Sequence, residues 1–236
     1  MAAAPKLSIV LPCYNPVGDW QHIVLQSFRD IRNRLLVPME LLLVNDGSRS
    51  FDLASARRFF SQEPAIQITG YEFNKGKGHA LRYGVQQAQG EFVIYTDVDF
   101  PYTEESFVAV YQSLLAGNEV AMGIRNSEYY SHLPQARVRV SKLLRWFIRT
   151  LLRIPTDDTQ CGLKGFDAKG KEAFLATTID RYLFDLEFVF MSARKKLRIA
   201  QVPVTLRQGV QLSKMNWQIL LQEFGNFLKI FVRSIF

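Results

Sequence analysis

The segment EFVIYTDVDF (91–100) joins a short apolar run to two aspartates, Asp97 and Asp99. The run has the length and the β-branched and aromatic content of a buried strand. Residues two apart in an extended chain face the same side, so both carboxylates can converge on one divalent cation. Carboxylate oxygens suit Mg²⁺ or Mn²⁺, which bridge substrate phosphates. The segment therefore predicts a metal site, although an Asp-x-Asp pair after a strand is also common as a polar turn or helix cap.

Apolar runs alternate with helix-like segments on both sides of this strand. The pattern predicts strands at 7–15, 39–46, 65–71, 91–97 and 118–124, and helices over 19–35, 51–60, 78–89 and 103–115. Strands that alternate with helices of this length indicate βαβ units. We therefore expect an α/β, Rossmann-like fold, with a mostly parallel sheet and helices on both faces. Ligands of such sheets bind beyond the carboxyl ends of the strands.

The second half of the chain has a different pattern. It holds a basic helical segment without acids at 137–153, a glycine-rich loop at 156–170, a helix over about 184–196, a strand at 199–206 and an amphipathic segment from about 214. Internal repeats, low-complexity tracts and linkers are absent from the sequence. We expect one catalytic domain over 1–212, followed by an amphipathic helix at 213–236 that faces a membrane or a partner.

The ends of the other strands deliver further candidate residues. The first strand delivers Pro12, Tyr14 and Asn15; groups suited to a nucleotide are Asp46 in VNDGS after the second strand and Lys77 in NKGKG after the third. An acid suits the ribose or base, glycines allow close backbone approach, and a lysine supplies charge. Each motif alone is more often an ordinary turn or basic loop. Their occurrence at successive strand ends predicts a nucleotide site.

Other phosphate-binding motifs do not fit. Gly70 and Lys75 fail the Walker spacing, and Gly76 and Gly78 supply only part of a Gly-x-Gly-x-x-Gly fingerprint. A second acid at Asp99 also fits a metal better than a ribose, which disfavours an NAD enzyme. The glycine-rich opening of the sugar nucleotidyltransferases is absent, because LPCYN (11–15) follows the first strand.

The conjunction of motifs resembles a known family. LPCYN, VNDGS, NKGKGHAL and TDVD, in this order, resemble the inverting glycosyltransferases with the GT-A fold. Further motifs resemble the polyprenyl-phosphate sugar synthases, which include the dolichol-phosphate mannose and glucose synthases. These motifs are GIR (123–125), Arg137 with Ser141, DTQCGLKGF (158–166), FDLE (184–187) and VPVTLR…SK (202–214). The similarity covers residues 7 to 214, and DTQCGLKGF discriminates best.

The resemblance implies a role for each matching residue. Pro12, Tyr14 and Asn15 would line the nucleotide pocket, Asp46 would hold the base or ribose, and Asp97 and Asp99 would face the metal-bound diphosphate near Lys77. Arg125, Arg137 and Arg207 would grip phosphates of the donor and acceptor, with Ser141 and Lys214 on the acceptor side and Asp158, Gln160 and Lys164 in the loop.

Two positions depart from the family pattern. Pro101 stands where the family often has a glutamine metal ligand, so we expect a thinner metal site or one completed elsewhere. Leu212 stands where a glycine precedes the Ser-Lys pair, which weakens the transfer of roles to Arg207, Ser213 and Lys214.

The expected chemistry favours a phosphate acceptor. A sugar leaves a nucleoside diphosphate through an oxocarbenium-like state, and a divalent ion and arginines stabilise the charge that builds on the diphosphate. A lipid phosphate with a pKa of about 6 is largely ionised at neutral pH and needs little general base. A glycan hydroxyl, the alternative acceptor, needs a carboxylate base such as Asp185 or Glu187. Both acids also suit an ordinary first helical turn.

Composition and charge limit the partners. The 236 residues are 48% apolar and 22% charged, which is typical of a packed globular chain, and the net charge of +7 indicates an anionic partner. Nucleic-acid binding is disfavoured, because it gives Asp97 and Asp99 no role. The expected donor is GDP-mannose or UDP-glucose, which the sequence does not distinguish. Cys13 and Cys161 are too few for a disulfide scaffold and favour a reducing compartment.

Two basic, apolar segments raise the question of a membrane. The segment 137–153 and WQILLQEFGNFLKIFVRSIF (217–236) have apolar residues at helical intervals beside Arg and Lys. Such helices contact anionic lipid or simply cover a sheet. The chain shows neither an export signal nor 18 consecutive apolar residues. We expect peripheral association with the cytoplasmic face of a membrane, with a partner or a further segment as a possible anchor.

Overall fold

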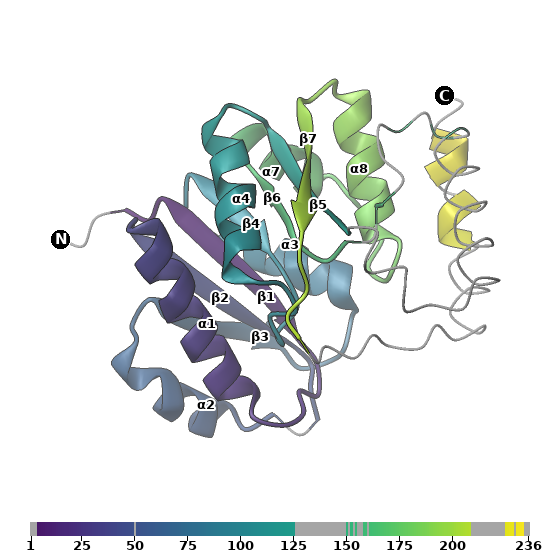
Figure 1. Cartoon of the computed structure of the whole chain (residues 1–236). Helices are drawn as coiled ribbons and strands as arrows, with labels where there is room; N and C mark the ends of the chain where they lie inside the picture. The colour runs from purple at the N-terminus through teal and green to yellow at the C-terminus, as the bar shows by residue number, and fades with distance from the viewer. Residues whose placement is uncertain are drawn as a thin grey trace.

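A seven-stranded sheet with helices on both faces forms the body of the computed structural model (Figure 1). The structure describes residues 4–49, 51–125, 150, 152, 154, 158–159, 161–208, 225–228 and 230–233. The strands are β1 (Leu7–Cys13), β2 (Met39–Asp46), β3 (Ile66–Tyr71), β4 (Phe92–Tyr95), β5 (Val120–Arg125), β6 (Lys164–Phe166) and β7 (Ile199–Val204). The helices are α1 (Trp20–Leu35), α2 (Leu53–Phe59), α3 (Lys77–Gln87), α4 (Glu104–Leu115), α7 (Ala168–Leu175) and α8 (Phe184–Arg194), with a 3-10 turn, η1 (Phe60–Gln62).

The sheet has the strand order β3-β2-β1-β4-β6-β5-β7. β1 runs parallel to β2 and β4, β2 to β3, and β5 to β7, whereas β6 is antiparallel to both of its neighbours. The carboxyl ends of β1 to β5 therefore lie at one edge, and β6 begins at that same edge, where Lys164 pairs with Tyr95 and Met122. The predicted α/β fold with a mostly parallel sheet is confirmed.

Each face of the sheet has its own hydrophobic core. Successive strand residues point to opposite faces, so Ile9 and Leu11 enter the core under α1 and α4, and Val10 enters the core under α3, α7 and α8. Both cores are fully buried at the middle strands, as the continuous apolar runs predict. This two-sided packing is what fixes the strand ends relative to one another.

The main difference from the prediction lies in the expected loop 156–170. Within it the structure places the three-residue strand β6 and the start of α7. Three residues are too few to show an alternating pattern, so periodicity could not reveal the strand. A Cβ at Gly165 would lie 2.9 Å from side-chain carbons of both Ile94 and Val110, so the central position of β6 requires glycine.

Other boundaries shift by a few residues. The predicted helix 51–60 is helical over Leu53–Phe59 and then tightens into η1, and the predicted strand 199–206 ends at Val204. Leu206 instead forms an isolated bridge with Tyr102. The basic segment 137–153 lies outside the described residues except at positions 150 and 152.

The C-terminal segment is helical at 225–228 and 230–233 and lies beside α8 (Figure 1). Ile230 is buried in the second core, and Phe227 and Phe231 pack against it. Leu228 and Val232 are exposed. The segment thus covers part of the core and also presents apolar side chains outward. Among the described residues, no helix is long and apolar enough to cross a bilayer.

Candidate active site

The carboxyl edge of the sheet gathers the predicted site residues. Pro12 is the next-to-last residue of β1, Asp46 ends β2, Lys77 starts α3, Asp97 and Asp99 follow β4, Arg125 ends β5, Lys164 starts β6 and Asp185 lies in the first turn of α8. They meet because parallel strands end at one edge and the antiparallel β6 begins there. Four other predicted residues, Arg137, Ser141, Gln160 and Lys214, lie outside the described residues.

The two aspartates lie close to Lys77. The Lys77 Nζ is 2.5 Å from Asp97 Oδ1. Burial opposes the charge of Lys77, but the carboxylates of Asp97, Asp185 and Asp99 outweigh it and raise the lysine pKa. Burial, and then the charge of Asp97, raise the pKa of Asp99. Two coupled carboxylates that share one lysine form a site to which a divalent cation is attracted.

A sharp turn follows the second aspartate. Phe100 has a φ of 44°, a left-handed conformation that an aromatic residue rarely adopts. Its ring is buried against Phe107, with centroids 5.6 Å apart, and its amide donates to the Asp97 carbonyl over 3.0 Å. Burial of the ring holds this strained turn in place, and strain of this kind concentrates at functional sites.

The donor set fits Mg²⁺ or Mn²⁺ that is held mainly by substrate. Within the described ranges no cluster of three or more His, Cys, Asp or Glu side chains could hold a metal. Pro101 is buried, and its carbonyl accepts the Arg207 amide over 2.9 Å. Two carboxylates nevertheless suit a cation that keeps several waters and takes the phosphates of its substrate as ligands.

Asp46 is buried among protein donors, with 2% of its surface exposed. Its carboxylate accepts hydrogen bonds from the Tyr71 hydroxyl at 2.7 Å, the Asn74 side chain at 2.8 Å and the amides of Lys75 and Gly76 at 2.8 and 3.0 Å. These bonds shape the loop that leads into Lys77. The expected contact of Asp46 with the base or ribose stays a prediction, since the described bonds give it a loop-shaping role.

The turn after β1 is tied to the turn after β2. Asn15, with a φ of 44°, donates its amide to the Ser48 hydroxyl at 2.9 Å, and its side-chain oxygen accepts the Arg49 amide at 3.1 Å. Tyr14 beside it is exposed. The connected turns leave an open aromatic ring at the edge where the nucleotide is expected.

Arg125 is held by Asp158 of the DTQCGLKGF loop. Asp158 Oδ2 accepts the Arg125 amide and Nε, each at 2.9 Å, and Oδ1 accepts Nη2 at 2.5 Å. Burial alone would raise the pKa of Asp158, but the hydrogen bonds and charge of Arg125 lower it. The pair joins the start of the loop to the end of β5. The phosphate contact expected of Arg125 stays a prediction.

The middle of this loop packs against the first aspartate. A Cβ at Gly162 would lie 2.9 Å from Asp97 Oδ2, so a larger residue would displace that carboxylate. The Gly162 amide donates to the Tyr102 hydroxyl over 2.9 Å, and Cys161 Sγ lies 3.3 Å from the same oxygen. Burial raises the pKa of Tyr102, which keeps its hydroxyl protonated. The loop is thereby fixed beside Asp97.

The two acids of FDLE have different surroundings. Asp185 Oδ1 accepts the Tyr95 hydroxyl at 2.5 Å and the Lys164 Nζ at 2.6 Å, within the site. Glu187 is buried and accepts the amides of Thr178 and Ile179, each at 2.8 Å, and the Arg233 guanidinium. Asp185 therefore belongs to the cluster at the sheet edge, whereas the bonds of Glu187 brace a neighbouring turn and the C-terminal helix.

Arg207 supports the segment behind the aspartates. Its Nη2 donates to Glu104 Oε1 at 2.5 Å, and its backbone bonds to Pro101. The Thr103 amide likewise donates to the Thr205 carbonyl over 3.0 Å. These contacts pair residues 101–104 with 205–207 and brace the turn after Asp99. The role expected of Arg207 at the acceptor phosphate stays a prediction.

The sequence patterns missed the turn 177–180, which clamps the start of α3. The Asp180 carbonyl accepts the amides of Gly78 and His79 at 2.8 and 3.3 Å. Arg82 donates to the Ile179 carbonyl at 2.8 Å and pairs with the Asp180 carboxylate. The turn thus satisfies amides that a helix start leaves free. Its residues lie outside every motif, so only the long-range contact identifies them.

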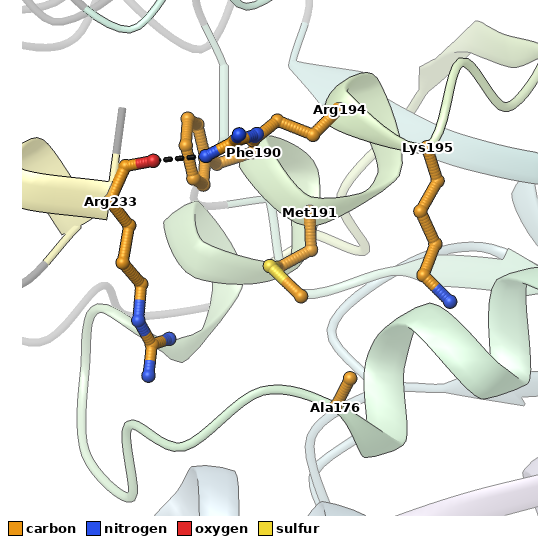
Figure 2. Close-up of a pocket in the computed structure, with 6 residues that line it drawn as sticks. All are labelled: Ala176, Phe190, Met191, Arg194, Lys195 and Arg233. Atoms are coloured by element: carbon orange, nitrogen blue, oxygen red, sulfur yellow. Dashed lines mark hydrogen bonds between the residues drawn. The ribbon is translucent and has the colours of Figure 1, made fainter. Parts of the chain in front are cut away.

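A groove of about 410 Å³ lies at the other end of α8. Figure 2 shows its lining: Ala176, Phe190, Met191, Arg194, Lys195 and Arg233. The Arg194 guanidinium donates to the Arg233 carbonyl across it. The lining is half apolar and half cationic. None of the residues at the sheet edge takes part in it, so this groove is separate from the candidate active site.

The fold is that of the GT-A glycosyltransferases. Glucosyl-3-phosphoglycerate synthase from Mycobacterium tuberculosis, crystallised with UDP, superimposes with a TM-score of 0.67 at 16% identity, covering 98% of this chain and 80% of that one. The mannosyltransferase PcManGT from Pyrobaculum calidifontis, in complex with GDP-Man and Mn²⁺, gives 0.56 at 14% identity, covering 96% and 65%.

The chain belongs to glycosyl transferase family 2, whose model matches residues 8–170. A dolichyl-phosphate beta-glucosyltransferase of Dictyostelium discoideum is 25% identical over 213 residues, which are 84% of this chain and 65% of that protein. The glycosyltransferase AglD of Haloferax volcanii is also 25% identical, over 94% of this chain and 38% of its own length. The chain thus spans less than two thirds of these two relatives.

Proposed function

We propose that this chain transfers a hexose from a nucleoside diphosphate sugar to a polyprenyl phosphate, with inversion at the sugar carbon. The observation that carries the proposal is the grouping of Lys77, Asp97 and Asp99 at the carboxyl edge of a GT-A sheet. Family membership supports glycosyl transfer, and relatives from Dictyostelium and Saccharomyces cerevisiae named as dolichyl-phosphate beta-glucosyltransferases support the acceptor class.

We call the carboxyl edge of the sheet around Lys77, Asp97 and Asp99 the acidic edge. The donor diphosphate would be held there. Asp97 and Asp99 would bind Mg²⁺ or Mn²⁺, which supplies positive charge to the leaving diphosphate. The metal complexes of structural neighbours, such as PcManGT with Mn²⁺, support this assignment. Lys77 lies on the same carboxylate, so it adds a second positive charge where negative charge develops. The exposed ring of Tyr14 and the tied turns after β1 and β2 would receive the nucleoside.

The transfer itself needs little proton movement. An ionised phosphate oxygen of the acceptor attacks the anomeric carbon from the face opposite the diphosphate. The carbon–oxygen bond to the diphosphate breaks, and the diphosphate leaves with the electron pair. Asp185 already accepts hydrogen bonds from Tyr95 and Lys164 on one oxygen. Because both bonds hold that oxygen within the protein, Asp185 is suited to positioning its neighbours rather than to taking a proton from a hydroxyl.

We propose glucose, carried by UDP, as the transferred sugar. Relatives in Dictyostelium discoideum, Saccharomyces cerevisiae and Homo sapiens are named as dolichyl-phosphate beta-glucosyltransferases. The Mycobacterium tuberculosis neighbour was crystallised with UDP. GDP-mannose is the alternative, since PcManGT binds GDP-Man.

We also propose that the region after 212 brings the enzyme to the cytoplasmic face of a membrane. Leu228 and Val232 are exposed on the last helix, and the groove beside it carries Arg194, Lys195 and Arg233. Exposed apolar side chains beside cations are typical of surfaces that contact anionic lipid. A membrane-anchoring partner would use the same surface.

The test is a transfer assay with radiolabelled UDP-glucose and GDP-mannose in Mn²⁺, each with a polyprenyl phosphate in detergent. We expect an organic-extractable, acid-labile product from UDP-glucose. The same product from GDP-mannose alone would reassign the sugar. A water-soluble labelled glycan formed on added oligosaccharide would reassign the acceptor to a hydroxyl.

A further inference from the structure

Lys164 is a charged side chain enclosed within the protein. Its side chain has 0% exposure, and its Nζ contacts the Cys161 carbonyl at 2.5 Å and Asp185 Oδ1 at 2.6 Å. The ammonium also lies 5.7 Å from the centre of the Tyr95 ring. An ammonium removed from water is stable only with such partners. The enclosed ammonium is therefore held by three fixed neighbours.

Three elements meet at this ammonium. Lys164 begins β6, Asp185 lies in the first turn of α8 and Tyr95 ends β4. The buried Tyr95 hydroxyl donates to the same Asp185 oxygen at 2.5 Å. Burial, and then the charge of Asp185, raise the pKa of Tyr95, so the hydroxyl remains a donor. We call Lys164, Asp185 and Tyr95 the buried lysine cluster.

Two routes lead from the cluster to Asp97. Through the Cys161 carbonyl, Lys164 holds the residue next to Gly162, where a Cβ would lie only 2.9 Å from Asp97 Oδ2. Through Asp185, the cluster adds negative charge near Lys77, which pairs with Asp97 Oδ1. One oxygen of Asp97 thus lies against the loop at Gly162. The other pairs with Lys77, whose charged form the carboxylate of Asp185 favours.

We propose that the buried lysine cluster positions Asp97 and Lys77 for a metal-bound nucleoside diphosphate, with Lys164 as a positioning residue. This inference rests on the proposed function of the acidic edge. Partners of metal-binding carboxylates typically affect metal affinity or activity by about 10- to 100-fold when they are removed. Lys164 is expected to act in this range although it does not touch the substrate.

A second ion pair offers a matched control. Arg32 Nη1 donates to the nearly buried Glu63 at 2.6 Å, where the end of α1 meets η1 and the strands begin. The Arg32 side chain is 37% exposed, whereas Lys164 is fully enclosed. Both pairs join separate elements, but the Arg32 pair lies at the opposite edge of the sheet from Asp97. Substituting the Arg32–Glu63 pair therefore shows how the loss of an ion pair far from Asp97 affects stability.

The experiment separates stability from positioning. Removing one partner of a buried ion pair destabilises a protein strongly, whereas replacing both is often nearly neutral. Lys164→Met is therefore expected to lower the Tm, and Lys164→Met with Asp185→Asn to recover most of it. Calorimetric titration of the double variant with Mn²⁺ and UDP should still give an affinity about tenfold below that of the wild type. Arg32→Met with Glu63→Gln should bind Mn²⁺ and UDP as the wild type does.

A double variant that recovers both the Tm and the affinity for Mn²⁺ and UDP would overturn the inference, because the cluster would then be structural only. Tyr95→Phe keeps both charges and the shape of the core, and should weaken the same affinity by a smaller factor. An unchanged affinity in Tyr95→Phe would equally contradict it. Failure of the wild type to glycosylate polyprenyl phosphate, with Mn²⁺ and UDP still bound, would overturn the proposed acceptor and leave this inference intact.

Discussion

The two ends of α8 carry opposite charges with different degrees of burial. At its start, Asp185 is buried against Lys164 and Tyr95 beside the acidic edge. At its end, Arg194 and Lys195 are exposed beside a groove (Figure 2). Acids near a helix start and cations near its end both suit the helix dipole. The start is therefore suited to fixing a site, and the end is suited to meeting an anionic surface.

Glu187, in the first turn of α8, links this helix to two further regions. Glu187 accepts hydrogen bonds from the turn 178–179 and from Arg233 of the last helix. The turn continues to Asp180, whose carbonyl caps α3 just after Lys77. One helix thus touches the C-terminal segment, the clamp of α3 and the acidic edge. Substitutions at each end of α8 should therefore separate donor binding at the acidic edge from membrane contact beside the groove.

The largest effect is expected at the acidic edge. Asp99→Ala should lower hexose transfer by on the order of 10³-fold, because the leaving diphosphate loses its metal-bound charge stabilisation. Initial rates at saturating donor and Mn²⁺ measure this. Asp52→Ala, which removes an exposed cap of α2, serves as the control and should keep the wild-type rate. A wild-type rate for Asp99→Ala would disprove the metal-site assignment.

A large effect on stability is expected where the loop joins β5. Asp158→Asn should cost about 3 kcal/mol at neutral pH, because the Arg125 guanidinium loses its charged partner. The folded-state pKa of Asp158 is lowered, so its stabilisation is present above the ordinary aspartate pKa of about 3.9 and is lost as the pH falls through the folded value. Urea unfolding at several pH values checks this. A difference that stays constant down to the lowest pH would contradict it.

A moderate effect is expected at the far end of α8. Arg194→Gln with Lys195→Gln should weaken binding to vesicles that contain anionic lipid by about 2 kcal/mol, or about thirtyfold, since each cation near such a surface contributes about 1 kcal/mol. Vesicle sedimentation measures this, and vesicles of neutral lipid provide the control. Transfer to acceptor in detergent should stay unchanged. Equal binding of variant and wild type would remove this surface from the proposal.

The smallest effect is a shift in pH dependence. Burial and the charge of Asp97 raise the pKa of Asp99, so Asp99 gains its proton at a higher pH than an ordinary aspartate. Binding of Mn²⁺ requires the ionised carboxylate. The affinity for Mn²⁺ should therefore begin to fall at a pH above the ordinary aspartate range as the solution is acidified. Titrations with Mn²⁺ across this range check it, and an onset below that range would contradict it.

The sequence by itself determined the order of most strands and helices along the chain and most residues of the acidic edge. Apolar runs and helical spacing identified β1 to β5 and α8, because each covers enough residues for its period to show. Asp97, Asp99 and Lys77 followed from local motifs at the strand ends, since parallel strands end at one edge.

Only the tertiary structure decided which acids work together. Asp185 and Glu187 lie two residues apart in one motif, yet one bonds Lys164 and Tyr95 and the other bonds residues 178–179 and Arg233. The same holds for β6, whose three residues carry too little pattern, and for Asp180, which belongs to no motif. A local pattern reports what one segment prefers. Burial and partners arise from residues distant in the chain, so they appear only when the sheet and its two helical layers have packed.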